Sequence, residues 1–416
     1  MPESDHHDDR PASIPTVARP DTAPRIEARS LGAPPVDARP YAASRDQGAG
    51  DEGRSDDAAA SPSAHGDQIP CRKCGAMLAY APGTRTLVCE HCGGETPIDG
   101  DSPPVLEQDY AAALEELASA HEQLTVRSMT CRSCGATTQL LPEVAAANCP
   151  YCGSHFNVTA ETKRVIKPHA VLPFAVARTT VEKAFRDWIG SLWFAPNALR
   201  REAEKDRLVD GLYLPHWTYD ASTTTAYQGW RGDHYTVTVG SGSNQRTEVR
   251  TRWRPASGTV RRRFDDVLVS ASTSGLTELA EALGGWDLAN LVAYDDRFVA
   301  GFLAEAYRVD LAGGFDRAKA IMAEVIDGDV RADIGGDAQR IDSRRTGYEQ
   351  VTFKHVLLPL WVGSFRYRSR AYRFLVNGRS GRVAGERPWS WIKITLACLA
   401  GAALIALIVA IAGSQR

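Results

Sequence analysis

Cys71-Arg-Lys-Cys74 opens a pattern of four C-x-x-C pairs that uses eight of the nine cysteines. Fourteen residues separate it from the second pair, and the whole arrangement recurs sixty positions later. Two such pairs supply four thiolates for one tetrahedral zinc ion, with the spacing of a zinc ribbon. The sequence therefore predicts two zinc ions, held by Cys71, Cys74, Cys89, Cys92 and by Cys131, Cys134, Cys149, Cys152.

A glycine follows each pair, at Gly75, Gly93, Gly135 and Gly153. Glycine permits the positive φ that turns backbone amides toward the sulfurs. A complete set of cysteine ligands leaves no position for water, so both sites are expected to be structural. Disulfides are the alternative in a secreted protein, but the sequence shows no secretory signal. His91 and His155 lie beside the cysteines, where a histidine can replace a thiolate.

Two segments flank the region from the ribbons onward. Residues 1–68 hold 13 acidic residues and 7 arginines with few large apolar side chains, so we expect a disordered acidic, Pro/Ala-rich segment. Ile394 to Ala412 is an apolar run long enough to cross a bilayer. Trp389 and Trp391 suit the membrane interface. The basic residues before the run predict that the soluble part lies in the cytoplasm, and the four residues after it predict a single-pass tail anchor, spanning 391–412.

The remaining chain predicts a multidomain protein. Zinc ribbons at 69–98 and 129–158 are joined by a helical connector at 99–128, and an α+β domain follows at 165–388. In that domain a capping box at Thr179 and Glu182 predicts a helix that Gly190 closes. Further helices are expected over 197–208, 288–307 and 315–326, the last with four residues inward: Phe315, Ala318, Ile321 and Val325.

Strand patterns lie between these helices, at 212–227 and 356–365. They share a short echo, Leu214-Pro-His-Trp217 and Leu358-Pro-Leu-Trp361, which suggests an internal duplication. A hairpin is expected over 235–264. Its arginines form a candidate surface for anionic lipid, an acidic protein or nucleic-acid phosphates, with a solvated edge as the alternative. They are Arg250, Arg252, Arg254, Arg261, Arg262 and Arg263.

Recognisable catalytic motifs are absent from the sequence. It has no Walker A loop, no H-E-x-x-H, no G-x-S-x-G and no dinucleotide-binding fingerprint, so helicase or ATPase activity is not expected. The acidic pairs Asp265-Asp266 and Asp295-Asp296 point to opposite faces of a regular strand, so neither predicts a catalytic dyad. The scattered histidines are expected to be structural.

Three stretches carry a resemblance: Leu212 to Asp220, Ala300 to Glu305, and Tyr372 to Pro388. Together with the twin ribbons, they resemble bacterial zinc-ribbon membrane proteins that are often labelled primosomal replication helicase-like or TFIIB-type zinc ribbon-containing. The resemblance implies zinc on the eight cysteines and a membrane anchor, and it lends no catalytic residue. We therefore expect a zinc-binding scaffold with a protein partner. The alternatives are nucleic-acid binding in replication or transcription, and an enzyme with an unrecognised site in 165–388.

Overall fold

The computed structural model describes residues 69–100, 103–119, 125–130, 137–140, 157–162, 166–203, 208–242, 245–274, 276–368 and 370–414. Every described residue belongs to the second of the chain's two units, Ala60–Arg416. The expected disorder of 1–68 lies outside the described residues.

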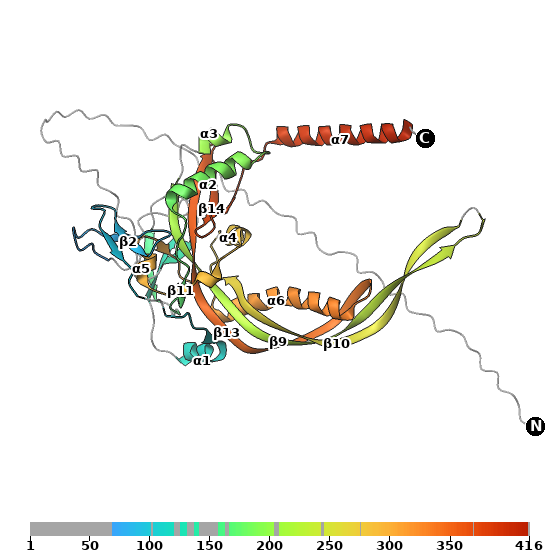
Figure 1. The fold of residues 1–416 in the computed structure, drawn as a ribbon, viewed down its shortest axis with the longest axis horizontal. Coiled ribbons are helices and arrows are strands. Elements are labelled where there is room, and N and C mark those ends of the chain that lie inside the picture. Colours follow the sequence, from blue (N-terminus) through green and yellow to red (C-terminus); the bar gives the residue numbers. More distant parts are fainter. Residues whose placement is uncertain are drawn as a thin grey trace, which may run out of the picture. The chain divides into compact units, whose positions relative to one another are not determined.

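A long antiparallel sheet forms the α+β body (Figure 1). Its strands follow the order β10-β9-β13-β14-β15, and β9 pairs with β13 along nearly its whole length. Alternation places Trp217, Tyr219 and Phe353 in a core against helix α6. The bounds are β9 Leu208–Val239, β10 Arg246–Ser270, β13 Ala338–Tyr367, β14 Arg370–Asn377 and β15 Val383–Gly385.

Short strands complete the edges of this sheet. β8 (Ala170–Val171) runs parallel to β13, and β12 (Leu303–Ala304) runs parallel to β9. β4 (Gln108–Asp109) pairs with β13, and β11 (Val292–Ala293) pairs with β8. The body's helices are α2 Arg178–Ser191, α3 Leu199–Ala203, α4 Thr277–Leu283, η2 Leu288–Asn290, α5 Asp296–Val299 and α6 Leu311–Ile334.

The two prolines of the sequence echo make the same contact in different strands. Ala271 donates to the Pro215 carbonyl at 3.0 Å, and Gly378 donates to the Pro359 carbonyl at 2.9 Å. Each proline therefore ends the ladder that its strand forms with the next strand of the chain, β10 or β14. The echo marks equivalent places in β9 and β13.

The tryptophans that follow these prolines also make equivalent hydrogen bonds. Trp217 Nε1 donates to the Val309 carbonyl and Trp361 Nε1 to the Val176 carbonyl, each at 2.9 Å. Val309 and Val176 lie just before α6 and α2. The order β8-α2-β9-β10 thus corresponds to β12-α6-β13-β14. The ancestral duplication itself stays a prediction.

Cysteine pairs flank the strands of a small sheet near the N-terminal end of the second unit. Its strands are β1 Leu78–Tyr80, β2 Thr86–Cys89 and β3 Glu95–Pro97. Another three-stranded sheet follows, with β5 Thr125–Thr130, β6 Thr137–Leu140 and β7 Asn157–Thr162. Between them lies α1, Tyr110–Ser119, which occupies only part of the expected connector. At the C-terminal end, α7 covers Trp391–Ser414.

Several helix predictions need correction. α2 has Ala177 as its N-cap with no side-chain cap, so the capping box at Thr179 and Glu182 does not form, and the helix ends one residue beyond Gly190. The segment 288–307 is mostly not helical, because η2 and α5 are short and the other residues form the two-residue strands β11 and β12 and the loops around them. In 197–208 the helix α3 ends at Ala203, and Leu208 already belongs to β9.

Helix α6 and the arginine hairpin also differ from expectation. α6 is longer than predicted and buries Met322 and Ile326, whereas Ile321 and Val325 are 45% and 37% exposed. Of the four residues expected inward, Phe315 and Ala318 are buried as predicted, and the buried stripe then continues through Met322 and Ile326 instead of Ile321 and Val325. The hairpin continues on both strands to Leu208 and Ser270, and Pro255 to Gly258 lie within β10.

Candidate metal centre

Four sulfurs meet beside β1 and β2. Cys71 Sγ lies 3.6 Å from Cys92 Sγ, and Cys74 Sγ lies 3.5 Å from Cys89 Sγ. All four sulfurs lie within 4.8 Å of one another, and none forms a disulfide. A tetrahedral zinc ion with 2.3 Å bonds requires sulfur separations of about 3.8 Å, so this set fits one zinc ion.

Backbone turns hold each pair in place. Gly75 donates to the Cys71 carbonyl and Gly93 to the Cys89 carbonyl, each at 2.9 Å. Both glycines have positive φ, at 76° and 66°. The predicted conformation of these two glycines is confirmed, and a side chain there would strain the turn. His91 is exposed, and the cluster is complete without it.

The amides of these turns act on the thiols. The Lys73 and Cys74 amides lower the pKa of Cys71 to about 7, and the Cys92 amide lowers the pKa of Cys89. The Ala76 amide lowers the pKa of Cys74, but contacts with the other sulfurs raise it to about 12. Four thiolates therefore require a cation among them, which is the role that zinc fills.

The sheet β1–β3, which carries the four cysteines, packs directly on the α+β body. Tyr80 donates its amide to the Ala300 carbonyl at 2.9 Å, and Gly83 donates to the Phe174 carbonyl at 2.8 Å. Gly301 has a φ of 85°, and a Cβ on it would lie 2.6 Å from Ala79 Cβ. Ala300 and Gly301, from the Ala300–Glu305 stretch, thus form the surface of the body on which strand β1 packs. Loss of the ion is expected to reach the body at Phe174 rather than stay within 69–98.

The second cysteine set, Cys131 to Cys152, lies outside the described residues, as do Gly135, Gly153 and His155. The strands around it repeat the first ribbon's pairing. Pro70 bridges to Met77 before and after the first pair, and Thr130 pairs with Thr137 in the equivalent positions. The described part of this sheet is therefore arranged like the first ribbon.

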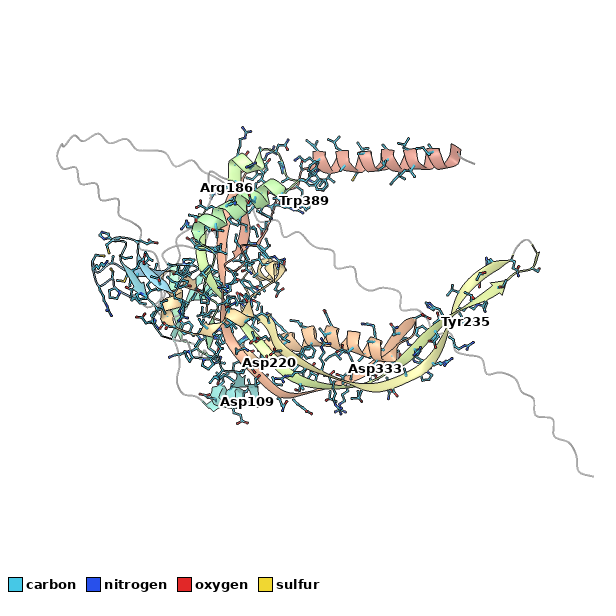
Figure 2. The ribbon with its side chains drawn as sticks, in the orientation of Figure 1. Asp109, Arg186, Asp220, Tyr235, Asp333 and Trp389 are labelled. Atoms are coloured by element: carbon cyan, nitrogen blue, oxygen red, sulfur yellow. The ribbon has the colours of Figure 1, made fainter. Side chains whose placement is uncertain are left out.

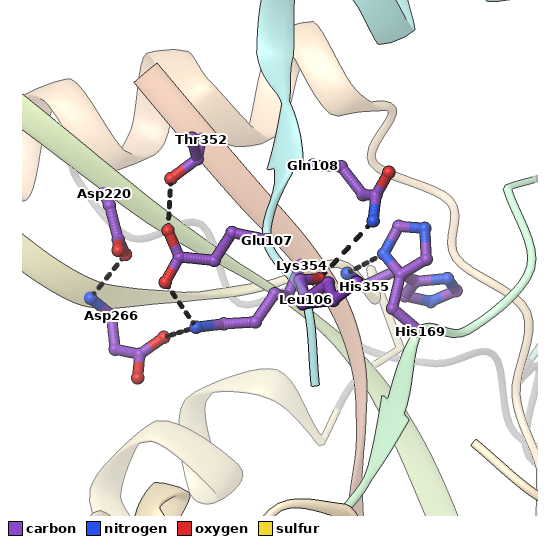
Figure 3. Close-up of polar contacts among 9 residues, drawn as sticks. All are labelled: Leu106, Glu107, Gln108, His169, Asp220, Asp266, Thr352, Lys354 and His355. Carbon is purple, nitrogen blue, oxygen red and sulfur yellow. Dashed lines mark hydrogen bonds and ion pairs between the residues drawn. The ribbon is translucent and has the colours of Figure 1, made fainter. Parts of the chain in front are cut away.

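A second polar cluster, which the sequence analysis missed, lies across the middle of the sheet (Figure 3). Lys354 Nζ contacts Asp266 Oδ1 at 2.7 Å and Glu107 Oε1 at 3.2 Å. Asp220 accepts from the Asp266 amide at 2.8 Å. Carboxylate oxygens of Glu107, Asp220 and Asp265 lie within 4.8 Å of one another.

Two β-bulges bring these acids together. Asp266 has a φ of 52° where the β10 register shifts, and Gln350 has a φ of 51° where the β13 register shifts. Asp220 lies on β9 between them. A bulge cancels the alternation that would separate Asp265 from Asp266. Burial, followed by the contact with Glu107, raises the pKa of Asp220 to about 7, although the Asp266 amide opposes this.

The candidate anionic-partner surface divides into two parts. Arg250 contacts Glu248 at 3.5 Å, Arg254 contacts Asp233 at 4.0 Å, and Arg252 lies over the Tyr235 ring. Arg262 binds Asp329 of α6 at 2.8 Å, so its guanidinium points toward that helix while the side chain stays 45% exposed. Arg261 and Arg263 are exposed on the other face of β10. The six arginines therefore do not form one continuous surface.

The body's inner histidines are neutral at pH 7. Burial lowers the pKa of His216 to about 4 and that of His355 to about 3. His355 Nδ1 lies 3.0 Å from the Ile166 carbonyl, and His169 Nδ1 accepts from the His355 amide. These contacts place both His169 and His355 in the hydrogen-bonded interior of the body.

Comparison with known proteins gives one informative relative. The chain is 25% identical over 253 residues to the "Uncharacterized protein YdjG" of Bacillus subtilis (strain 168), covering 58% of this chain and 70% of that protein. No model of a known protein family matches the chain, and no solved structure matches it.

Proposed function

We propose that the protein is a membrane-anchored, zinc-binding scaffold whose soluble part faces the cytoplasm. The observation that carries the proposal is the closed cluster of four cysteine sulfurs, seated on the α+β body through Tyr80 and Gly83. A closed tetrahedral site stabilises structure and leaves no position for a substrate. The metal is therefore assigned to shaping a contact surface.

The second element of the proposal is the C-terminal helix. Among the described residues, one helix is long and apolar enough to cross a membrane, through Trp391–Ile408, and none of that window is buried. Lys393 Nζ donates to the carbonyls of Trp193 and Ala195 at 3.0 and 2.8 Å, and the Ser390 amide donates to Phe194 at 2.7 Å. These contacts tie the start of α7 to the loop after α2.

Exposed tryptophans in that loop and at the start of α7 support the placement of a bilayer beside the body. Trp193 is 78% exposed, as is Trp391, and Trp389 is 50% exposed. Figure 2 labels Trp389 next to this end of the body. Tryptophan favours the membrane interface, where its ring is apolar and its N–H remains hydrated. Trp193 is thus placed to enter the headgroup region beside the span.

A second zinc ion, in residues 129–158, completes the proposal. Its support is the repeated cysteine pattern and the shared strand pairing. Metal analysis of full-length protein, purified in detergent, is expected to give two zinc ions per chain. Cys74→Ser and Cys134→Ser should each lower that content by about one ion, because three thiolates bind far more weakly than four.

Cys398 offers a matched control, because it lies in α7 and belongs to neither set. Cys398→Ser should keep the full zinc content. A wild-type protein with no stoichiometric zinc would refute the metal-binding role. A content of one ion, unaffected by Cys134→Ser, would refute the second site alone.

Nucleic-acid binding stays the alternative function, supported by the exposed Arg261 and Arg263. Retention of DNA or RNA should then fall steeply with salt and be lost in an Arg261→Ala, Arg263→Ala double variant. The ion pairs and ring contacts of Arg250, Arg252 and Arg254 favour the scaffold role. Vesicles with and without phosphatidylserine test whether anionic lipid binds Arg261 and Arg263 instead.

A further inference from the structure

The outer edge of β14 is covered by a short strand. β15 pairs there through Gly385, Ala384 and Val383, which lie opposite Phe374, Leu375 and Val376. A Cβ on Gly385 would lie 2.8 Å from Trp188 of α2, and Ala384 packs with the residues of α4. β15 thus fills a position at the sheet edge, bounded by one helix on each face.

The equivalent edge of β10 is Val267–Val269. Val269 lies opposite Trp217 as Val376 lies opposite Trp361, so the two stretches correspond. Among the described strands, β10 pairs only with β9. A cavity of about 680 Å³ occupies the equivalent of the β15 position, and its lining includes Leu268, Ser270, Trp286, Leu288, Arg317 and Ile321.

Backbone geometry shows which groups of β10 face this cavity. Ala271 donates inward to Pro215, so the alternate residues Val269 and Val267 also bond toward β9. Leu268 and Ser270 then direct their amides and carbonyls outward. Arg317 Nη1 reaches the Ser270 carbonyl at 3.2 Å from α6, as this orientation requires. On β14, Asn377 corresponds to Ser270, and its amide likewise points outward and donates to the Arg382 carbonyl beside β15.

We propose that this edge of β10 binds an extended peptide segment of a partner protein by strand addition, in the position that β15 occupies on β14. The inference gives a partner class to the proposed scaffold role and rests on it. An exposed strand edge supplies main-chain hydrogen bonds, and side pockets select alternate side chains. The cavity volume lies within the range of ligand sites.

The lining predicts the peptide's side chains. A residue opposite Val269 faces α6 beside the Arg317 guanidinium, which favours a carboxylate. A residue opposite Leu268 faces Trp286 and Leu288, which favours a large apolar side chain. The peptide residue opposite Val267 lies beside Ile321 of α6. At the corresponding place beside α2, the larger Trp188 leaves room only for Gly385, so the smaller Ile321 admits a valine. In the direction of β15, the expected core is therefore Glu-Leu-Val.

The test is a fluorescence anisotropy titration of full-length protein in lipid nanodiscs. The probe is a blocked, fluorescein-labelled nonapeptide, Gly-Ser-Thr-Glu-Leu-Val-Thr-Ser-Gly. Ile321→Glu should weaken its binding at least about tenfold, because it places a charge against the valine. Arg317→Glu should also weaken it, and this variant should instead prefer the same peptide with Lys-Leu-Val, because the charges then match.

Val325→Glu is the matched control, since Val325 is exposed on α6 one turn beyond the cavity. It should leave probe binding unchanged. Equal binding by wild type, Ile321→Glu and Arg317→Glu, or no binding at all, would overturn the inference while leaving zinc content and membrane attachment untouched. A dimer that Ile321→Glu dissociates in sedimentation would assign the edge to a second copy and also overturn it.

Discussion

Asp220 shows how one side chain can depend on backbone irregularities in its neighbours. The bulges at Asp266 and Gln350 place an amide, a second carboxyl and Lys354 around it. Lys354 is buried and bonded to both Asp266 and Glu107, so the cluster joins the segment before α1 to the sheet. Burial, together with the neighbouring Glu107 carboxylate, makes the Asp220 carboxyl hold its proton to a higher pH than in water, so its pKa is raised.

This arrangement predicts a falling stability between pH 4 and 7. Asp220 has a pKa of about 7 when folded against an ordinary value of 3.8, so the folded state binds more protons in that range. Unfolding free energy then decreases as the pH rises. The expected decrease is about 2 kcal/mol, allowing for partial access of water. Denaturant titrations at several pH values measure it.

Asp220→Asn should flatten this profile, because an amide has no proton to lose in that range. Glu107 has a lowered pKa, so its own contribution is lost only as the pH falls below the Asp220 window. Glu349→Gln, on the exposed part of β13, should leave the slope unchanged. An unaltered slope in Asp220→Asn would contradict the assignment.

At the scale of elements, the first turn of α6 makes its closest approach to the sheet at Gly314. A Cβ on Gly314 would lie 2.4 Å from the Tyr219 hydroxyl and 2.7 Å from the Trp217 ring. Tyr219 also donates to the Leu311 carbonyl at 2.7 Å, so the first turn of the helix lies against β9. Gly328 of the same helix would meet nothing within 4 Å.

These two glycines should respond oppositely to the same substitution. Gly314→Ala is expected to lower the unfolding free energy by about 2 kcal/mol through overpacking. Gly328→Ala should raise it by about 0.5–1 kcal/mol, because alanine favours the helix over glycine. Thermal or denaturant unfolding of both variants checks the pair. Equal effects of both substitutions would mean that the Gly314 contact is looser than described.

Sequence patterns predicted these elements unequally. Only 356–365 of β13 was predicted as a strand, because apolar and β-branched residues are concentrated there, and its more polar part at 338–355 was missed. The segment 288–307 looked helical because its apolar residues are closely spaced, yet they serve β11, β12 and the surface on which β1 packs. The Asp220 cluster was not predictable, since it depends on two bulges that shift the register by contacts distant in sequence. The cluster of Cys71, Cys74, Cys89 and Cys92 was predictable, because cysteine spacing is a local signal in the sequence.

For the whole molecule, the contacts between the start of α7 and the loop at 192–198 bear on how the proposed span would meet a bilayer. Lys393 and Ser390 bond to that loop, and its Trp193 is exposed beside the proposed span. If the helix crosses a membrane, three tryptophans should lie at one interface. Trp253, 45% exposed on the β10 part of the hairpin, should remain in water.

Quenching by brominated lipids tests this placement. In vesicles containing them, Trp193→Phe should remove about a third of the quenchable fluorescence, because Trp389 and Trp391 supply the rest. Trp253→Phe should not change the quenchable part. If quenching is unchanged in Trp193→Phe, the loop does not contact the membrane. A complete lack of quenching would contradict the membrane anchor.

The bonds from Lys393 have a mechanical consequence. Tension along α7 would enter the soluble part through the backbone of 386–390, which leads to β15, and through the Lys393 bonds to the carbonyls of Trp193 and Ala195, directly after α2. α2 packs through Phe185 on Phe374, in the strand that β15 borders. A force from the membrane would thus act on the part of the sheet that contains β14, whose edge is covered by β15. It would not act on β10, whose edge is open.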